Sequence, residues 1–280
     1  MRLEGRPGSR NIEDRRGMGA TLPIGGGIGG LVLVLLFSAL TGQNPLDLIN
    51  SGTGGEPETV GTSGVREDDP QGQFVARVLG DTEETWRQVF GERGEAYAPP
   101  ILVLFTGATR SACGTGSAAM GPFYCPVDRK VYLDLSFFRD LDERFGAPGD
   151  FAQAYVIAHE VGHHVQTMTG VSERVSAMRG RVGEADANAL SVRQELQADC
   201  FAGVWGFYAA KRSLLEPGDT EEGLRAASAI GDDRLQQRAQ GYVVPESFTH
   251  GSSAQRVEWF RRGLESGKPE ACDTFSRESH

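Results

Sequence analysis

A helical segment that carries two histidines and a glutamate is the feature that most constrains this chain. Residues 151–158 contain no proline or glycine and lead directly into His159-Glu160-x-x-His163. Positions i and i+4 lie on one face of an α-helix, with Cβ atoms about 5–6 Å apart, so two imidazoles can bind one small cation. Glu160 lies beside the first histidine, where a carboxylate can serve as general base toward a zinc-activated water. The pattern predicts the metal-binding helix of a zinc hydrolase, with Asp150 as its N-cap.

The third metal ligand has few candidate sources. The chain contains five histidines, and the positions where a three-histidine site of the H-E-x-x-H-x-x-G-x-x-H type needs Gly and His hold Gln166 and Thr169, which excludes that class. A glutamate on a later helix is the other common solution, and Glu195 fits it. Asp199, one turn further on, fits as the carboxylate that accepts the second N–H of a ligating histidine. We predict one zinc ion per chain, held by His159, His163 and Glu195, with Asp199 behind His159.

Two simpler interpretations of the same residues stay open. The two histidines could lie on an ordinary helix surface, and Glu195 and Asp199 could belong to the solvated face of an amphipathic helix. His164 is expected either behind the ligands or on the surface. The sequence favours the metal site because these residue types occur together at the spacing that a metal needs.

The four cysteines are even in number and all lie C-terminal to residue 100. Cys113 and Cys125 bracket a glycine-rich loop, which favours a local disulfide, and Cys200 with Cys272 would then join a helix to the C-terminal region. Four cysteines allow three pairings, and the sequence does not choose among them. Zinc binding by these cysteines is disfavoured because no C-x-x-C pair exists.

An uncharged apolar run near the N-terminus, residues 22–40, is long enough to span a bilayer. Arginines precede it and none follows it directly, which predicts a cytoplasmic N-terminus and an exported remainder. A cleaved signal peptide is the alternative, although the run is longer than a typical signal core. We therefore divide the chain into a cytoplasmic tail (1–20), a transmembrane helix (21–41), a flexible linker (42–69) and a zinc metallopeptidase domain (70–280).

The rest of the chain predicts an α+β fold with a small β-sheet and several helices. Short apolar runs predict strands at 101–106, 123–125 and 131–136, the last of these as the sheet edge. Apolar residues at helical spacing predict helices at 74–90, 137–145, 151–168, 187–211, 224–239 and 253–264. Strands followed by an H-E-x-x-H helix agree with the zincin plan, in which an extended peptide can add to the sheet edge.

The charge balance argues against one class of partner. The chain has a formal net charge of −10 and no basic stripe interleaved with aromatic residues. Nucleic-acid binding requires clustered Lys and Arg, so we predict no nucleic-acid partner. The sequence does not indicate an oligomeric state.

Several motifs resemble those of a known family. H-E-V-G-H-H followed by Q-E-L-Q-A-D-C-F-A-G-V-W is similar to the gluzincin arrangement of thermolysin-like peptidases. The chain more closely resembles the bacterial neutral zinc metallopeptidase family, through S-R-N-I-E-D-R-R-G, C-G-T-G-S-A-A-M-G-P-F-Y-C-P, I-G-D-D-R-L-Q and F-T-H-G-S-S-A-Q-R-V-x-W-F. The resemblance runs from Arg10 to about Phe275 and implies a membrane-anchored peptidase domain.

The resemblance to thermolysin-like sites also implies roles for two further residues. His250 is expected to donate to the developing oxyanion as a catalytic residue, and Arg256 to steady the carboxylates behind the ligands. The alternative for His250 is a polar residue that precedes a helix.

The expected activity is hydrolysis of peptide bonds in a peptide or protein substrate, with Glu160 as general base. The expected location is the bacterial inner membrane, with a single span, a cytoplasmic N-terminus and an exported catalytic domain. A zinc amidase that acts on a cell-wall substrate is one alternative. A non-catalytic zinc module that binds peptides or envelope components is the other, and the intact Glu160 argues against it.

Overall fold

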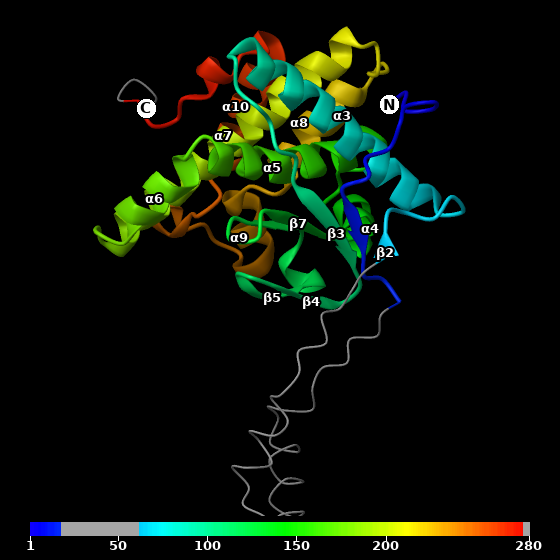
Figure 1. Cartoon of the computed structure of the whole chain (residues 1–280). Helices are drawn as coiled ribbons and strands as arrows, with labels where there is room; N and C mark the ends of the chain where they lie inside the picture. The colour runs from blue at the N-terminus through cyan, green and yellow to red at the C-terminus, as the bar shows by residue number, and fades with distance from the viewer. Residues whose placement is uncertain (18–61, 277–280) are drawn as a thin grey trace, which may run out of the picture.

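The computed structural model describes residues 1–17 and 62–276 of the chain, and it has the predicted α+β architecture. A small sheet packs against a layer of helices, and helix α5 lies between the sheet and several of the other helices (Figure 1). The predicted helix at 151–168 corresponds to α5 (Asp150–Met168). Its N-cap is Gly149, so Asp150 is the first helical residue and not the cap as predicted.

The main sheet has five strands in the order β2-β1-β3-β7-β6. Its strands are β1 (Ile12–Asp14), β2 (Thr62–Ser63), β3 (Ile101–Phe105), β6 (Phe123–Cys125) and β7 (Lys130–Asp134). The three central strands run parallel, and the two outer strands pair antiparallel with their neighbours. A separate hairpin joins β4 (Ala108–Ser111) to β5 (Gly114–Ser117). The sheet edge nearest α5 is therefore β6, and the prediction that residues 131–136 form the edge was wrong.

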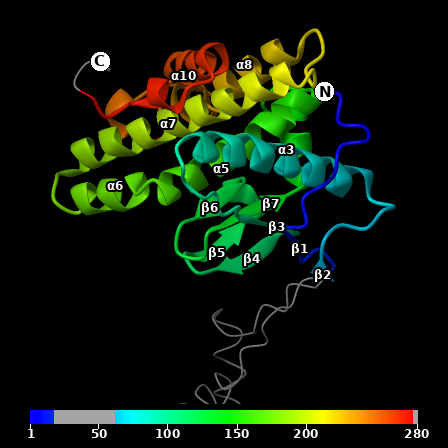
Figure 2. The ribbon, with the colours of Figure 1, turned by 45° about the horizontal axis from the view of Figure 1, so that its top comes forward.

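In chain order the helices are α3 (Pro70–Glu92), α4 (Ser136–Glu143), α5, α6 (Val171–Arg179), α7 (Glu184–Lys211), α8 (Asp219–Ala229), α9 (Asp232–Gln240) and α10 (Ser253–Ser266). Of these, α3, α7, α8 and α10 lie on the side of α5 opposite the sheet (Figure 2). Short 3-10 turns lie at Ala118–Met120, Pro245–Ser247 and Pro269–Cys272. The apolar side chains of α5 are almost completely buried, because the helix contacts the sheet on one face and α7 and α8 on the others.

The helix predicted at 224–239 is two helices separated at Gly231. The Gly231 backbone lies directly against the backbone of Ser253, so a side chain at this position would collide with the start of α10. The backbone N–H of Asp232 donates to the carbonyl of Gly251 at 2.9 Å. This contact turns the chain and points the N-terminus of α9 at the loop before α10.

A second glycine sets the distance between the two helices that carry the predicted ligands. A Cβ atom at Gly162 on α5 would lie 2.9 Å from the carbonyl oxygen of Ala198 on α7, closer than a carbon can approach it. The absence of a side chain lets α7 approach α5 closely, directly beside His163 and about one turn from Glu195. Two disulfides add further links, Cys113–Cys125 between the β4–β5 hairpin and β6, and Cys200–Cys272 between α7 and the C-terminal turn, as the sequence favoured.

The N-terminal residues belong to the same folded unit as the helices. Strand β1 pairs with β3, and Leu3 and Ile12 are buried in the main core. The unit therefore includes residues 1–17, whereas the sequence placed its start at residue 70. The pattern missed this because a three-residue strand with two acidic side chains carries no strand signal of its own.

The predicted membrane span, residues 21–41, lies outside the described residues, as does most of the predicted linker. Residues 62–69 of that linker form β2 and the N-cap of α3, where the Asp69 carboxylate accepts from the Gly72 N–H. Among the helices that the structure does describe, none has both the length and the apolar character needed to cross a membrane.

Candidate metal centre

His159, His163 and Glu195 meet at one point between α5 and α7. One atom from each of them lies within 4.8 Å of the other two. The Nε2 atom of His159 is 3.2 Å from Glu195 Oε2, and the Nε2 atom of His163 is 3.4 Å from Glu195 Oε1. Two ligand atoms on a tetrahedral zinc are about 3.4 Å apart, given bond lengths of about 2.1 Å. The donor set and its spacing therefore fit zinc, with a fourth position left for a non-protein ligand.

Each histidine is oriented by a second hydrogen bond on its other nitrogen. His159 Nδ1 lies 2.8 Å from Asp199 Oδ1, and His163 Nδ1 lies 2.9 Å from Gln166 Oε1. These acceptors keep the proton on Nδ1, so each ring presents its Nε2 on the side of Glu195, where a metal would bind. The structure places Asp199 where the sequence predicted it. Gln166 was noted only as a residue that excludes a third histidine, although it lies at i+3 from His163 on the same helix.

The Asp199 carboxylate is completely buried and compensated by charge. Arg256 on α10 donates to it from Nε at 2.8 Å and from Nη2 at 2.9 Å, and Tyr155 donates its hydroxyl at 2.5 Å. Burial alone would raise the pKa of Asp199, but Arg256 and His159 hold that pKa below its ordinary value. The carboxylate therefore stays ionised and fixes the ring of His159. Arg256 lies where it was predicted, whereas Tyr155 was not recognised, although it is one turn before His159.

Glu160 faces the same space as the three ligands. It lines a cavity of about 900 Å³ together with His159, His163 and Glu195, and little of its side chain is exposed. Burial raises the pKa of Glu160, against the opposing effect of the two histidines. A carboxylate with a raised pKa is suited to accept and then release a proton near neutral pH.

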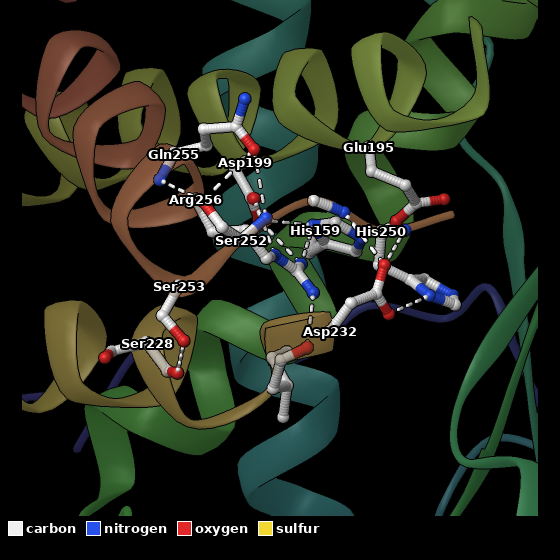
Figure 3. A network of polar contacts seen from close by, with 12 residues as sticks. His159, Glu195, Asp199, Ser228, Asp232, His250, Ser252, Ser253, Gln255 and Arg256 are labelled. Atoms are coloured by element: carbon white, nitrogen blue, oxygen red, sulfur yellow. Dashed lines mark hydrogen bonds and ion pairs between the residues drawn. The ribbon is translucent and has the colours of Figure 1, made fainter. Parts of the chain in front are cut away.

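His250 also lines this cavity and is held by an aspartate of its own. Asp232, at the start of α9, accepts the backbone N–H groups of Thr249 (2.7 Å), His250 (2.6 Å) and Gly251 (3.1 Å) on Oδ2. Its Oδ1 lies 3.1 Å from His250 Nδ1 (Figure 3). The hydrogen bond with Asp232 raises the pKa of His250, although burial acts in the opposite direction. Sequence reasoning missed Asp232, because its position opposite the loop depends on the break at Gly231.

The wall of the cavity away from the ligands is largely aromatic and aliphatic. It includes the edge strand β6, which pairs only with β7 among the described strands. Phe123 and Tyr124 on β6 contribute to it, as do Phe137 near the start of α4 and Phe145 just beyond its end. An extended chain that lies along β6 would place its side chains against these rings.

His164 has a structural role. It is buried, its Nε2–H donates to the carbonyl of Ala98 at 2.7 Å, and its Nδ1 accepts from the Tyr124 hydroxyl at 3.1 Å. Burial lowers the pKa of His164 to about 4. The residue is therefore a neutral connection between α5 and β6 and takes no part in metal binding.

Comparisons with known proteins place the chain in a family. The model of the family described as "Putative neutral zinc metallopeptidase" matches residues 1–275. The uncharacterised protein YpfJ of Escherichia coli (strain K12) is 48% identical over 287 residues, which cover 99% of both chains. An uncharacterised protein of Mycobacterium tuberculosis (strain ATCC 25618 / H37Rv) is 48% identical over 191 residues, 64% of each chain. No solved structure matches the chain.

Proposed function

The chain belongs to the neutral zinc metallopeptidase family, and we propose that it hydrolyses peptide bonds. We further propose that its zincin-type domain is exported and attached to the membrane. The family implies a zinc cofactor, and His159, His163 and Glu195 would hold it. The observation that carries the proposal is an intact Glu160 in the same cavity as three converging ligand atoms. A closed structural zinc site has four protein ligands and does not need a carboxylate beside an open position.

When bound, zinc supplies Lewis-acid polarisation of a carbonyl and lowers the pKa of a water. Side chains of the protein transfer the protons and hold the ligands in place. Glu160 takes one proton from the attacking water as the water oxygen bonds to the carbonyl carbon. It then delivers that proton to the nitrogen of the scissile bond, and the bond breaks to release the amine and the acid. Asp199 and Arg256 keep the ring of His159 in place throughout.

His250 is proposed to stabilise the oxyanion. Its Nδ1 is engaged by Asp232, so its Nε2 is the nitrogen left to face the cavity. A positioned donor at a developing negative charge contributes about 10²- to 10³-fold in rate. The proposed substrate is an extended peptide added along the free edge of β6, which would place its backbone near both His250 and Glu160.

The proposed location rests on the two disulfides and on residues 22–40. Disulfides persist in oxidising compartments outside the cytoplasm, which favours an exported domain. The uncharged apolar run at residues 22–40 favours attachment to the cytoplasmic membrane.

The test compares full-length wild type with Glu160→Gln, and uses Glu173→Gln on the exposed face of α6 as the matched control. Zinc content is measured first, and cleavage sites are then profiled on a whole-proteome peptide mixture. We expect zinc in all three proteins and cleavage by wild type and Glu173→Gln, with a loss of about 10²- to 10⁴-fold in Glu160→Gln. Equal cleavage by Glu160→Gln would overturn the assignment of the base. Zinc binding without cleavage by any of them would favour a peptide-binding module, or an amidase that acts on cell-wall material.

A further inference from the structure

The N-terminal strand lies inside the sheet of the catalytic domain. β1 runs between β2 and β3, with Ile12 opposite Leu102 and Asp14 opposite Leu104. The Leu102 N–H donates to the Asn11 carbonyl, and the Arg15 N–H donates to the Leu104 carbonyl, both at 2.8 Å. Paired strands are about 4.8 Å apart, whereas the hydrocarbon core of a bilayer is about 30 Å thick. β1 and β3 therefore cannot lie on opposite sides of a membrane.

The residues before β1 are also hydrogen-bonded to the helical part of the domain. The Arg2 N–H donates to the Leu214 carbonyl at 2.7 Å, and the Ser9 N–H donates to the Ala76 carbonyl at 2.8 Å. Arg6 donates to the buried carboxylate of Asp81 at 3.0 Å. That carboxylate also accepts from Trp205 and Arg212 of the α7 region. The N-terminal segment thus takes part in a buried polar network of the domain.

The described residues on the two sides of segment 18–61 lie next to each other in the domain. Glu13 lies opposite Ser63 in the antiparallel β1–β2 pair, and the Gly64 N–H donates to the Ile12 carbonyl at 2.8 Å. Arg16 forms an ion pair with Asp69, the N-cap of α3. Figure 2 shows β1 and β2 beside each other at the end of the sheet away from α7.

From these contacts we infer that residues 1–17 share a compartment with the metal centre, so that any membrane attachment between residues 17 and 62 begins and ends on the same face of the bilayer. The expected topology, with a cytoplasmic N-terminus and one crossing before the domain, is incompatible with the folded sheet. Together with the proposed export of the domain, this places the N-terminus outside the cytoplasm. The relative placement of the two segments does not depend on the proposed activity or on the side.

Two single cysteines in the full-length protein test the placement. Glu4→Cys and Arg261→Cys both lie at exposed positions, one before β1 and the other on α10. Spheroplasts that express each variant are treated with a membrane-impermeant maleimide, and detergent-lysed samples give complete labelling for reference. The wild type, whose four cysteines form two disulfides, gives the background.

We expect equal labelling of both variants in intact spheroplasts. Protection of both variants until lysis would support the shared compartment and refute the proposed export. Labelling of Arg261→Cys with protection of Glu4→Cys would overturn the inference, whatever the enzyme's activity.

A cross-strand cysteine pair tests the β1–β2 contact itself. Glu13→Cys/Ser63→Cys places thiols on directly opposed residues, and the two single variants are the controls. We expect a new disulfide between the two peptides on non-reducing peptide mapping of the exported protein. Intact native disulfides without the new one would show that β1 is not paired with β2, and would contradict the inference.

Discussion

Two histidines line the same cavity, each paired with an aspartate behind it, and the two pairs differ in burial and in their other partners. The His159–Asp199 pair is buried between helices, and its carboxylate also accepts from Arg256 and Tyr155. The His250–Asp232 pair joins a loop to a helix start, and about half of the His250 side chain is exposed (52%). The first pair is surrounded by compensating groups that hold one protonation state and one geometry. In the second pair Asp232 is buried, but the half-exposed His250 ring can gain or lose a proton. The more buried pair is therefore suited to hold a metal ligand, and the more exposed pair is suited to act on a substrate.

The largest effect is expected from Asp199→Ala. The change leaves the Arg256 guanidinium buried without its partner, which costs about 3–5 kcal/mol of folding free energy. It also releases His159, so zinc affinity should fall about 10- to 100-fold. Urea unfolding of the metal-free protein and zinc titration against a chelating dye measure the two effects. The double variant Asp199→Leu/Arg256→Met should be more stable than the single variant. Equal stability would show that the buried charge is not the cause.

His250→Ala should change the rate and leave metal binding and folding unaffected. Loss of one donor to the oxyanion predicts a fall in kcat/KM of about 10²-fold. Zinc content and urea midpoint should match the wild type, since the side chain is half exposed and is not a ligand. A lowered zinc content would contradict the distinction between the two pairs.

Gln166→Ala tests whether the second ligand is held less tightly than the first. The amide orients His163 without a charge, so its loss should lower zinc affinity by about tenfold, less than Asp199→Ala does. Gln166 also donates to the Gln194 carbonyl at 2.6 Å, so the melting temperature is recorded as a control. A larger loss of zinc affinity than in Asp199→Ala would show that the contact from Gln166 matters more to the site than the contact from Asp199.

The smallest change at neutral pH is expected from Asp232→Asn, and it should appear mainly in the pH profile. Asp232 raises the pKa of His250, Glu195 acts in the same direction, and Arg256 opposes it. A protonated His250 is present below its pKa and is lost as the pH rises through it. Removal of the Asp232 charge should therefore move the alkaline limb of kcat/KM to lower pH. An unchanged limb would mean that a different group sets it.

The sequence pointed to the candidate ligands because helical periodicity alone pairs them within each helix. His159 and His163 are four residues apart, as are Glu195 and Asp199, so each pair shares a helix face wherever the helices lie. The outer residues were harder to find. Gln166 and Tyr155 are common residue types on buried helices and have no distinctive spacing. Asp232 reaches His250 only because the chain turns at Gly231, a contact that depends on the position of α10.

The placement of the N-terminus could not be predicted for a similar reason. Ile12-Glu13-Asp14 is short and mostly charged, and its strand conformation comes from partners at residues 62–63 and 101–105. A linear reading of the apolar run at 22–40 assigns the residues on its two sides to different compartments. Tertiary strand pairing brings the residues on the two sides together, and no local sequence pattern indicates that pairing.

Gly162 makes the H-E-x-x-H motif a determinant of helix packing as well as of metal binding. Its backbone lies against the Ala198 carbonyl, so one of the two unspecified positions of the motif is a spacer between helices. A methyl group there would push α7 outward and carry Glu195 away from His159 and His163, without altering any atom that binds metal. An engineer who transplants this motif to another scaffold would therefore need to carry over the helix crossing together with the ligands. Whether the position of Gly162 tolerates any residue other than glycine in the new scaffold would test whether that crossing has been reproduced.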